Sequence, residues 1–279
     1  MSSGYFEFIR DFLKDHSGLV VTPDKMYLLE TRLMPLARTH GYESIDEMVD
    51  VIRKNPRAPL ATEISEAMNT HESLFFRDRD PFDLFKSTIV PELLKRRATQ
   101  RKFRIWCAAC SSGQEPYSLA MVLDEMASEL RGWRPEIIAT DISRSVLDRA
   151  QEGMFSQFEV QRGLPVQLLM KHFKQHGEYW QISPEIRSMI TFRQQNLLKD
   201  LNVLGKFDMV MCRNVLIYFD IDTKIKVLEN IGELLHSDGV LFLGSSESTM
   251  GLTEKLWPVQ SGRGVYKHKD GPASLAEPS

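Results

Sequence analysis

The chain has 279 residues, of which 42% are hydrophobic and 26% charged, as in soluble globular proteins. This length allows one large domain or two ordinary ones, and the composition excludes a fibrous repeat, a disulfide scaffold and a chain that is disordered throughout. Lys and Arg number 35 against 38 Asp and Glu, a net charge of -3, so the composition predicts no nucleic-acid partner.

The first residues, MSSGYFEFIRDFLKDHSG, carry charges where a secretory signal would have its apolar segment. No run of about 18 uncharged apolar residues follows, so we expect no direct membrane insertion. The three cysteines, Cys107, Cys110 and Cys212, are few and odd in number, which favours a reducing compartment and a cytoplasmic protein. Cys107 and Cys110 form a C-x-x-C pair, but no further Cys or His pair completes a zinc set. We therefore expect no metal and interpret both as structural thiols.

The N-terminal part of the chain has a helical pattern. Apolar residues recur at helical spacing from Tyr5 to Gly18 and from Asp24 to Gly41, and both segments end in glycine, a common helix stop. Ser44 and Glu47 have the spacing of a capping box at the start of a third helix. Further helices are predicted over 58–69 and 80–98. We therefore predict an all-α domain over 1–80 and a linker helix over 81–97.

After Arg97, short apolar runs alternate with helical segments, which predicts a parallel α/β sheet with right-handed crossovers. The predicted strands are FRIWCAA (103–109), EIIATD (136–141), FDMVMCRN (207–214), GVLFLGSS (239–246) and GVYKH (264–268). The predicted helices are PYSLAMVLDEMASEL (116–130), SRSVLDRAQ (143–151) and KIKVLENIGELL (224–235). Residues 153–192, with a strand at Met189–Phe192, interrupt the alternation and are interpreted as an inserted subdomain. The α/β domain is predicted over 98–270 and a disordered tail over 271–279.

Open α/β sheets bind their ligands at the carboxyl ends of the strands. The first such loop, residues 108–118, has a single glycine, Gly113, and matches neither a dinucleotide-binding fingerprint nor a P-loop. Glu115 in this loop would repel a pyrophosphate, and Asp141 ends the second strand, where an acid typically binds ribose hydroxyls. The pair predicts a nucleoside ligand without phosphates, such as the positively charged S-adenosylmethionine. Two solvated or helix-capping acids are the alternative interpretation.

Two further strings contain candidate site residues. Arg213 and Asn214 directly follow the third strand, and Tyr218 is close to them in the sequence. The string THESLFFRDRDPF, residues 70–82, places Arg77 after two phenylalanines. Because guanidinium groups match carboxylates, Arg77 is a candidate for orienting an anionic group. For Tyr218, the alternative to a functional role is that of an aromatic side chain lining the core. For the two phenylalanines and Arg77, the alternative is packing or helix capping.

Five strings, in the order ESLFFRD, CAACSSGQEPYSLAM, ATDIS, QNLL and DMVMCRNVLIYFD, resemble the CheR-type chemoreceptor glutamate methyltransferases. The similarity runs from about residue 5 to residue 268 and covers both parts of the chain. It implies an all-α N-terminal domain and a Rossmann-like S-adenosylmethionine domain with a small antiparallel β-subdomain at 153–192. It also implies methyl transfer from S-adenosylmethionine to glutamate carboxylates of methyl-accepting chemotaxis receptors, for sensory adaptation, with S-adenosylhomocysteine as the second product.

The resemblance also implies roles for individual residues. The implied cofactor contacts are His71, Ser73, Arg77, Glu115, Asp141, Asn196, Leu197, Arg213 and Asn214. Among them, Glu115 would hold the methionine amino group, Asp141 the ribose, and Asn196 with Leu197 the adenine. Arg77 and Tyr218 are implied catalytic residues that face the substrate glutamate. The implied partner is the cytoplasmic helical domain of a receptor, which would meet Arg32 and Arg38; a solvated helix face is the alternative for these two.

Two features depart from the usual family pattern. The string T-N-x-T-x-F-F-R reads T-H-E-S-L-F-F-R here, so His71 replaces asparagine and Ser73 replaces threonine. The turn within KHFKQHGEYWQI is short, whereas members that bind a C-terminal receptor pentapeptide have a longer, glycine-rich loop there. This difference implies a pentapeptide-independent member. No dimerisation stripe is visible in the sequence, so a monomer is expected.

Three other functions compete with this interpretation. A non-catalytic S-adenosylmethionine-binding docking module of a signalling array would keep the fold without transferring a methyl group; the set of Arg77, Arg213, Asn214 and Tyr218 argues against it. A methyltransferase for RNA or a small molecule is disfavoured because the chain has no basic stripe. An NAD-dependent oxidoreductase is disfavoured because the glycine fingerprint is missing.

Overall fold

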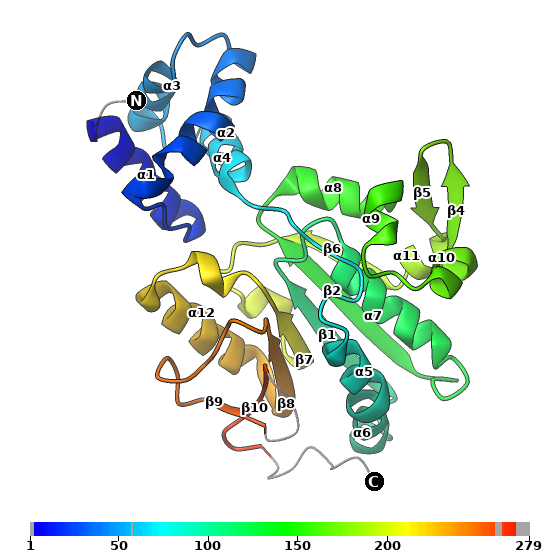
Figure 1. Ribbon diagram of the computed structural model, residues 1–279. Helices are drawn as coiled ribbons and strands as arrows, with labels where there is room; N and C mark the ends of the chain where they lie inside the picture. The colour runs from blue at the N-terminus through cyan, green and yellow to red at the C-terminus, as the bar shows by residue number, and fades with distance from the viewer. Residues whose placement is uncertain (1–2, 57, 260–263, 272–279) are drawn as a thin grey trace. The chain divides into compact units, whose positions relative to one another are not determined.

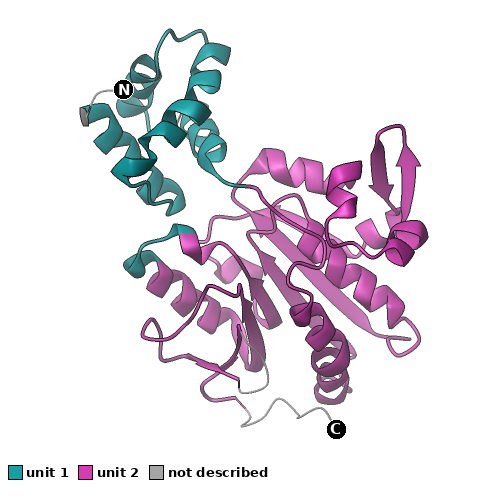
Figure 2. Cartoon of the chain, viewed as in Figure 1, with its two compact units in different colours: residues 1–70, 218–223 teal, residues 71–217, 224–279 magenta. Residues whose placement is uncertain are grey.

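The chain forms two compact units, which Figure 2 shows in different colours. The computed structural model describes residues 3–56, 58–259 and 264–271, so residues 272–279 of the predicted tail lie outside the described residues. The helical unit comprises Met1–Thr70 and Tyr218–Thr223, and the α/β unit comprises His71–Ile217 and Lys224–Ser279. The sequence predicts a boundary at residue 80, but the division falls at residue 70, because Phe75 and Phe76 pack in the core of the α/β unit.

The helical unit is built from short helices around one apolar core. Its elements are α1 (Ser3–Ser17), the 3-10 turn η1 (Pro23–Lys25), α2 (Met26–Thr39), α3 (Ile45–Lys54) and α4 (Pro59–Met68). The apolar stripes predicted from the sequence face this core, where Ile9 and Leu33 are fully buried. Ser44 caps α3 by accepting the Glu47 backbone N–H at 3.2 Å. The Glu47 carboxylate accepts the N–H of Glu43, so only one half of the predicted capping box forms.

The chain segment Tyr218–Thr223 belongs to the helical unit although it lies far along the sequence. The Val20 backbone N–H donates to the Tyr218 carbonyl at 3.0 Å. Lys14 pairs with Asp220 at 2.6 Å, and this ion pair lowers the pKa of the Asp220 carboxyl to about 2. Gly18 has a φ of +80°, and a Cβ there would lie 2.9 Å from the Phe219 ring. These contacts hold the segment Tyr218–Thr223 against α1 and the residues that follow it.

A seven-stranded mixed sheet forms the centre of the α/β unit (Figure 1). Its strands are β1 (Lys102–Ala108), β2 (Arg134–Asp141), β6 (Ile190–Gln194), β7 (Phe207–Cys212), β8 (Leu235–Leu243), β9 (Leu256–Pro258) and β10 (Val265–His268). The order is β6-β2-β1-β7-β8-β10-β9. The first five strands in this order pair in parallel, and their central members are continuous apolar runs, as expected for strands covered on both faces.

The last predicted strand, GVYKH, does not continue the parallel arrangement. It forms β10, which runs antiparallel to β8 and to β9. The described part of the connection between β8 and β10 contains no helix, and a parallel pairing requires a crossover of that kind. Strand β9 has no counterpart among the predicted strands. The prediction of a wholly parallel sheet is therefore wrong at this edge.

Helices connect the parallel strands. They are α7 (Gln114–Glu125) after β1, α8 (Arg144–Glu152) after β2, and the 3-10 turn η4 (Leu216–Tyr218) with α12 (Ile221–Leu234) between β7 and β8. The predicted linker helix consists of α5 (Asp80–Leu84), the π-helical turn η2 (Phe85–Ile89) and α6 (Val90–Arg96). Pro91 has no N–H to donate, and the preceding Val90 N–H reaches back to the Phe85 carbonyl. Proline thus accounts for the widened turn.

The insertion is a small subdomain with its own antiparallel sheet, in the order β3-β5-β4. Its elements are β3 (Met154–Ser156), α9 (Gln157–Gln161), α10 (Val166–His172), β4 (Phe173–His176), β5 (Tyr179–Ile182) and α11 (Pro184–Arg187). The strand predicted at Met189–Phe192 exists as β6, but it pairs with β2 in the main sheet. The insertion therefore ends before β6, which the 3-10 turn η3 (Asn202–Leu204) separates from β7.

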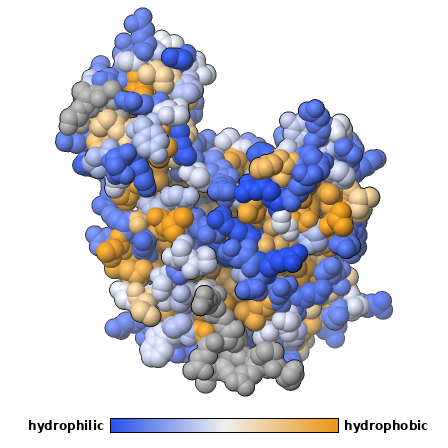
Figure 3. All heavy atoms as spheres, viewed as in Figure 1, coloured by the Kyte–Doolittle hydropathy of each residue, from blue (hydrophilic) through white to orange (hydrophobic). Residues whose placement is uncertain are grey.

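Exposed apolar side chains come from many different elements. The most exposed of the large ones are Tyr27, Phe158, Val166, Met170, Val203, Ile221, Met250 and Trp257. On the face of the molecule in Figure 3, apolar groups lie dispersed among hydrophilic ones. Among residues 3–56, 58–259 and 264–271, no helix combines the length and the apolarity that a membrane crossing requires.

Candidate functional site

The strand order places a switch point at β1. Strand β2 follows β1 in the chain and lies on one side of it, whereas β7 lies on the other side. Open α/β sheets bind ligands at such a point, outside the carboxyl ends of the strands. Asp141 is the last residue of β2, Arg213 directly follows β7, and Glu115 lies in the first turn of α7. These three residues therefore lie at one edge of the sheet.

The loop between β1 and α7 is tightly folded. Its left-handed residues are Ala109 (φ 53°), Ser111 (φ 52°) and Gly113 (φ 92°). Gly113 precedes α7 as its N-cap residue, and an added Cβ there would lie 3.1 Å from the Tyr117 ring. The close ring and the positive φ both favour glycine at this position. The loop turns the chain sharply from the strand into the helix and so brings Glu115 to the edge of the sheet.

Asp141 is a buried carboxylate that organises this loop. It accepts the Ser111 backbone N–H at 2.9 Å on one oxygen and the Ser143 N–H at 3.0 Å on the other. Only 6% of its surface is exposed, and burial raises the pKa of its carboxyl although these hydrogen bonds and the nearby His71 lower it. A carboxylate has about four acceptor positions. Asp141 therefore keeps acceptor capacity for a ligand hydroxyl.

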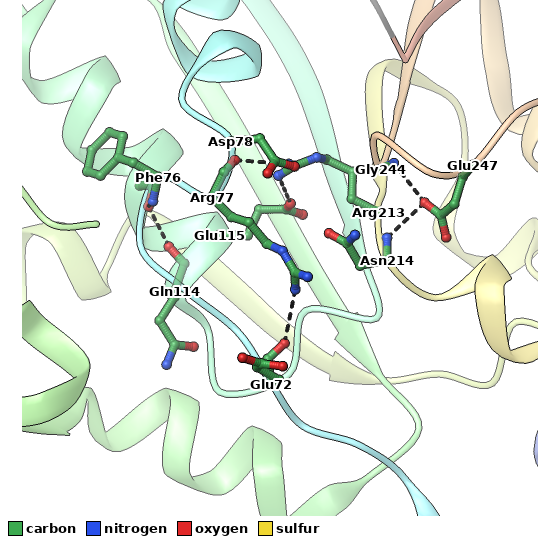
Figure 4. Close-up of polar contacts among 11 residues, drawn as sticks. Glu72, Phe76, Arg77, Asp78, Gln114, Glu115, Arg213, Asn214, Gly244 and Glu247 are labelled. Atoms are coloured by element: carbon green, nitrogen blue, oxygen red, sulfur yellow. Dashed lines mark hydrogen bonds and ion pairs between the residues drawn. The ribbon is translucent and has the colours of Figure 1, made fainter. Parts of the chain in front are cut away.

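Arg213 links two acidic side chains (Figure 4). Its Nη1 donates to the Glu115 carboxylate at 2.9 Å and its Nη2 to the Asp78 carboxylate at 2.7 Å. Only 1% of the Arg213 side chain is exposed. Its Nε–H is buried and has no hydrogen-bond partner among the described residues. The guanidinium thus offers one further donor at the site.

Glu115 is largely buried, with 14% of its side chain exposed. Burial raises the pKa of its carboxyl, and the neighbouring Arg213 opposes that shift. Because Arg213 also serves Asp78, the single guanidinium faces two carboxylates. Arg77 also lowers the pKa of the Glu115 carboxyl, and a cationic ligand group beside Glu115 would stabilise its charge further. The site is therefore suited to a ligand with an ammonium group.

The segment from His71 to Arg77 crosses the same edge of the sheet and is held by its backbone. The His71 carbonyl accepts the Ser111 hydroxyl at 3.2 Å, and the Phe76 N–H donates to the Ser118 hydroxyl at 3.0 Å. The Arg77 carbonyl accepts the Nη2 of Arg213 at 2.9 Å. Arg77 Nη1 reaches the Glu72 carbonyl at the long distance of 3.4 Å, so this contact holds the side chain only weakly (Figure 4). Ser73 lies between these anchored residues and is half-buried.

Glu247, which the sequence analysis did not single out, binds a row of backbone amides. Its two carboxylate oxygens accept the N–H groups of Asn214, Val215, Leu216, Ile217 and Gly244, at 2.8, 2.9, 2.8, 3.3 and 2.7 Å. The loops after β7 and β8 are thereby tied together (Figure 4), and Asn214 is held at a φ of +58°. The sequence signal for this role is an acid directly after the predicted strand GVLFLGSS, which neighbours the strand that precedes Arg213.

The remaining predicted site residues lie in two different places. Asn196 and Leu197 follow β6, whose last residue is in register with Asp141, so they stand at the same edge. The Asn196 side chain accepts the Leu198 N–H at 2.9 Å, and Leu197 is buried. Tyr218 belongs to the helical unit and is not part of the group described above.

Arg32 and Arg38 lie on α2 of the helical unit, in different surroundings. Arg32 donates to the carbonyls of Met68 and Asn69 at 2.5 and 3.2 Å and to the Thr70 hydroxyl at 3.1 Å, so it fastens the end of α4. Arg38 is exposed in the last turn of α2. Six residues advance a helix by about 600°, so the two side chains leave α2 on different sides. Of these two arginines, Arg38 is the one whose side chain is exposed to solvent, whereas the guanidinium of Arg32 is hydrogen-bonded within the helical unit.

The cysteines are structural in this fold. Cys107, Cys110 and Cys212 are all buried and free, and burial raises the pKa of each thiol well above its usual value. Such thiols are inert as nucleophiles. Across the described residues, no group of three or more His, Cys, Asp or Glu side chains is placed to hold a metal ion.

Two family models match the chain. The model described as "CheR methyltransferase, all-alpha domain" matches residues 5–69. The model described as "CheR methyltransferase, SAM binding domain" matches residues 71–265. The junction between the two matches coincides with the division of the structure after Thr70.

Named relatives are similar over almost the whole chain. The chain is 40% identical over 271 residues to the chemotaxis protein methyltransferase Cher2 of Pseudomonas putida, which covers 95% of this chain and 98% of that protein. It is 42% identical over 269 residues to chemotaxis protein methyltransferase 1 of Pseudomonas aeruginosa, with 95% and 97% covered. It is 38% identical over 269 residues to chemotaxis protein methyltransferase 1 of Vibrio cholerae, with 95% and 96% covered. The similarity thus includes both units and the insertion.

Proposed function

Because the chain belongs to the CheR methyltransferase family, we propose that it transfers a methyl group from S-adenosylmethionine to glutamate side chains of chemotaxis receptors. The products are glutamyl methyl esters and S-adenosylhomocysteine, and the reaction serves sensory adaptation. The observation that carries the proposal is the pair of buried carboxylates, Glu115 and Asp141, beside Arg213 at the switch point of the sheet.

The residues at this edge fit S-adenosylmethionine. Asp141 has acceptor capacity for the two ribose hydroxyls, and Glu115 can compensate the charge of the amino group. The buried, unpartnered Nε–H of Arg213 fits a carboxylate or another acceptor of the same ligand. Asn196 and Leu197, at the end of β6, border the adenine in this proposal. When bound, the ligand supplies an electrophilic methyl group on a cationic sulfur.

The chemistry needs no general base. A glutamate side chain with a pKa of about 4.3 is already an anion at neutral pH. Its carboxylate oxygen forms a bond to the methyl carbon while the carbon–sulfur bond breaks and that electron pair stays on sulfur, so an anion and a cation give two neutral products. Water stabilises the separated charges better than the transition state. Exclusion of water and an in-line arrangement of the reactants therefore account for the acceleration.

Arg77 orients the substrate carboxylate in this proposal. Its weakly held guanidinium is available to a ligand, whereas its backbone is fixed by Arg213. We expect Arg77→Lys to lower kcat for receptor methylation about tenfold, because an ammonium cannot replace the planar fork, and Arg77→Ala to lower it further. Arg144→Ala, on the exposed face of α8, is the control and should leave kcat unchanged. Wild-type turnover in both Arg77 variants would disprove the role of this side chain.

The function itself is tested with a purified receptor cytoplasmic domain and S-adenosylmethionine labelled in the methyl group. The expected result is label in the receptor that is released as methanol by mild base, because methyl esters are base-labile and methylated amines are not. Label must disappear when the acceptor glutamates are changed to alanine. Binding of S-adenosylhomocysteine without any transfer would instead support the non-catalytic docking module.

The raised pKa of Glu115 predicts how cofactor binding depends on pH. The ionised carboxylate is the form that attracts an ammonium group, so affinity for S-adenosylhomocysteine is full above this pKa and falls as the pH drops through it. Since burial raises the pKa, the fall begins at a higher pH than for an ordinary glutamate, and each further pH unit costs about tenfold in Kd. Calorimetry across acidic pH measures this. The Glu115→Gln variant must bind more weakly at neutral pH and show a shallower profile; an unchanged profile would refute the assignment.

The receptor contacts are proposed from the family resemblance. Arg38 is exposed on α2 and can meet an acidic receptor helix, and Tyr218 faces the substrate in this proposal. Strands β4 and β5 are joined only by Gly177 and Glu178. This short turn supports pentapeptide-independent action, because members that bind the receptor pentapeptide have a longer loop at this place.

A further inference from the structure

The insertion contacts the segment that bears Arg77. Phe75, two residues before Arg77, is completely buried, and its ring meets the Phe155 ring of β3 edge-on at 4.9 Å and the Phe173 ring of β4 at 5.7 Å. Glu72 forms an ion pair with Arg162, which lies between α9 and α10, at 3.0 Å. The segment that leads to Arg77 therefore packs on the insertion through the side chains of Glu72 and Phe75.

Gly163 makes the closest approach between these two parts of the chain. It has a φ of +87°, and a Cβ built on it would lie 2.0 Å from the Phe75 carbonyl oxygen. Real Cβ atoms essentially never come closer than 3.0 Å to such an atom, so any other residue would force a shift of about 1 Å. The neighbouring atom is backbone, which cannot rotate away as the end of a side chain can.

The opposite side of the segment is bound to the cofactor edge of the sheet. There the Phe76 N–H donates to Ser118 and the Arg77 carbonyl accepts from Arg213. The segment is therefore held between the insertion and the loops that carry Glu115 and Arg213. A shift at Phe75 would reach Arg77 through the backbone of Phe76, the one residue between them.

We propose that Gly163 is a positioning residue, through which the insertion braces the segment that carries Arg77 at the catalytic edge of the sheet. This inference rests on the proposed role of Arg77 in methyl transfer. It gives the insertion a function within the active site of this chain, in addition to any contact with a receptor. The insertion is thus part of the catalytic architecture.

The test compares Gly163→Ala with Gly177→Ala. Both glycines belong to the insertion and both have a positive φ, +87° and +63°, so both variants carry the same kind of backbone strain. Nothing lies within 4 Å of the Cβ position at Gly177. We expect Gly163→Ala to lower kcat for receptor methylation at least about tenfold more than Gly177→Ala, because a misplacement of about 1 Å can cost up to about 100-fold. Equal kcat values in the two variants would overturn the proposal.

A second readout does not depend on turnover. The hydrogen-exchange rate of the Phe76 amide reports whether its N–H keeps the hydrogen bond to the Ser118 hydroxyl. We expect Gly163→Ala to accelerate this exchange at least about tenfold relative to Gly177→Ala, while amides of β1 and β7 keep their protection. An unchanged exchange rate at Phe76 would disprove the positioning role of Gly163, even if methylation fails for another reason. Failure of the wild-type protein to methylate the receptor would count against the proposed function alone.

If Gly163→Ala does not fold, the Arg162–Glu72 ion pair provides the deciding test. Both side chains are partly exposed, at 38% and 58%, so their loss should hardly affect the midpoint of unfolding. We expect Arg162→Met and Glu72→Gln each to lower kcat about threefold, and the double variant to be no slower than either one. Wild-type kcat in both single variants, or fully additive losses, would overturn the proposal.

Discussion

Replacing Asp141 by alanine is expected to raise the Kd for S-adenosylhomocysteine at least about 30-fold, as measured by calorimetry. Two effects combine in this loss. The carboxylate holds the β1–α7 loop through the N–H groups of Ser111 and Ser143, and it is the proposed acceptor for the ribose hydroxyls. Truncation of one partner in a buried, charge-assisted set of hydrogen bonds costs about 2–5 kcal/mol, which corresponds to at least about 30-fold in affinity.

Two variants show whether the loss is specific. Asp141→Asn keeps one carbonyl oxygen and should bind with an intermediate Kd, because one of the two N–H groups retains its acceptor. Asp148→Ala removes a carboxylate that pairs with Arg144 on the exposed side of α8 and should leave Kd unchanged. A folded Asp141→Ala variant with the wild-type Kd would show that the ligand does not occupy this edge of the sheet.

The core of the candidate site could be predicted because its determinants are local. Asp141 ends a strand, Arg213 directly follows one, and Glu115 opens a helix after a glycine turn. Once the alternation of strands and helices indicates a parallel sheet, these positions must share one edge. The burial that raises the pKa of Glu115 and Asp141 could not be predicted, because it depends on segments distant in the sequence.

The errors concern features that depend on contacts between distant segments. GVYKH has the composition of a strand in any orientation. Its antiparallel pairing with β8 fits the connection between them, whose described residues form no crossover helix. The boundary at residue 80 follows the end of the helical pattern, whereas the structure divides at residue 70, because Phe75 meets the rings of the insertion. The hydrogen bond from Arg32 to the Met68 carbonyl at the end of α4 likewise joins segments that are distant in the sequence, and the prediction that Arg32 contacts a receptor stays a prediction.

Glu247 is the most consequential residue outside the sequence predictions. An acid after a strand has no distinctive pattern, and its importance lies in the five backbone N–H groups that converge on it from two loops. Consecutive N–H groups that point to one centre form an anion-binding nest. In this fold an internal carboxylate occupies the nest, and the fixed loop carries Arg213 and Asn214 to the cofactor edge.

Removal of this carboxylate should therefore affect both folding and binding. We expect Glu247→Ala to lower the free energy of unfolding by about 3–5 kcal/mol, because several buried N–H groups lose their acceptor together. Glu247→Gln keeps the shape but turns an amide donor toward backbone donors, and we expect a loss of about 2 kcal/mol. Urea unfolding of the two variants measures these losses.

The Glu247→Gln variant also separates a positioning role from a purely structural one. At a temperature where it is fully folded, we expect its Kd for S-adenosylhomocysteine to rise about tenfold, since the loop no longer holds Arg213 against Glu115 in one geometry. The matched control is Glu254→Gln, an exposed glutamate farther along the same post-β8 segment, which should leave stability and Kd unchanged. Wild-type stability together with wild-type affinity in Glu247→Gln would mean that the five hydrogen bonds do not hold this loop in place. The site would then owe its geometry to β7 and α7 alone.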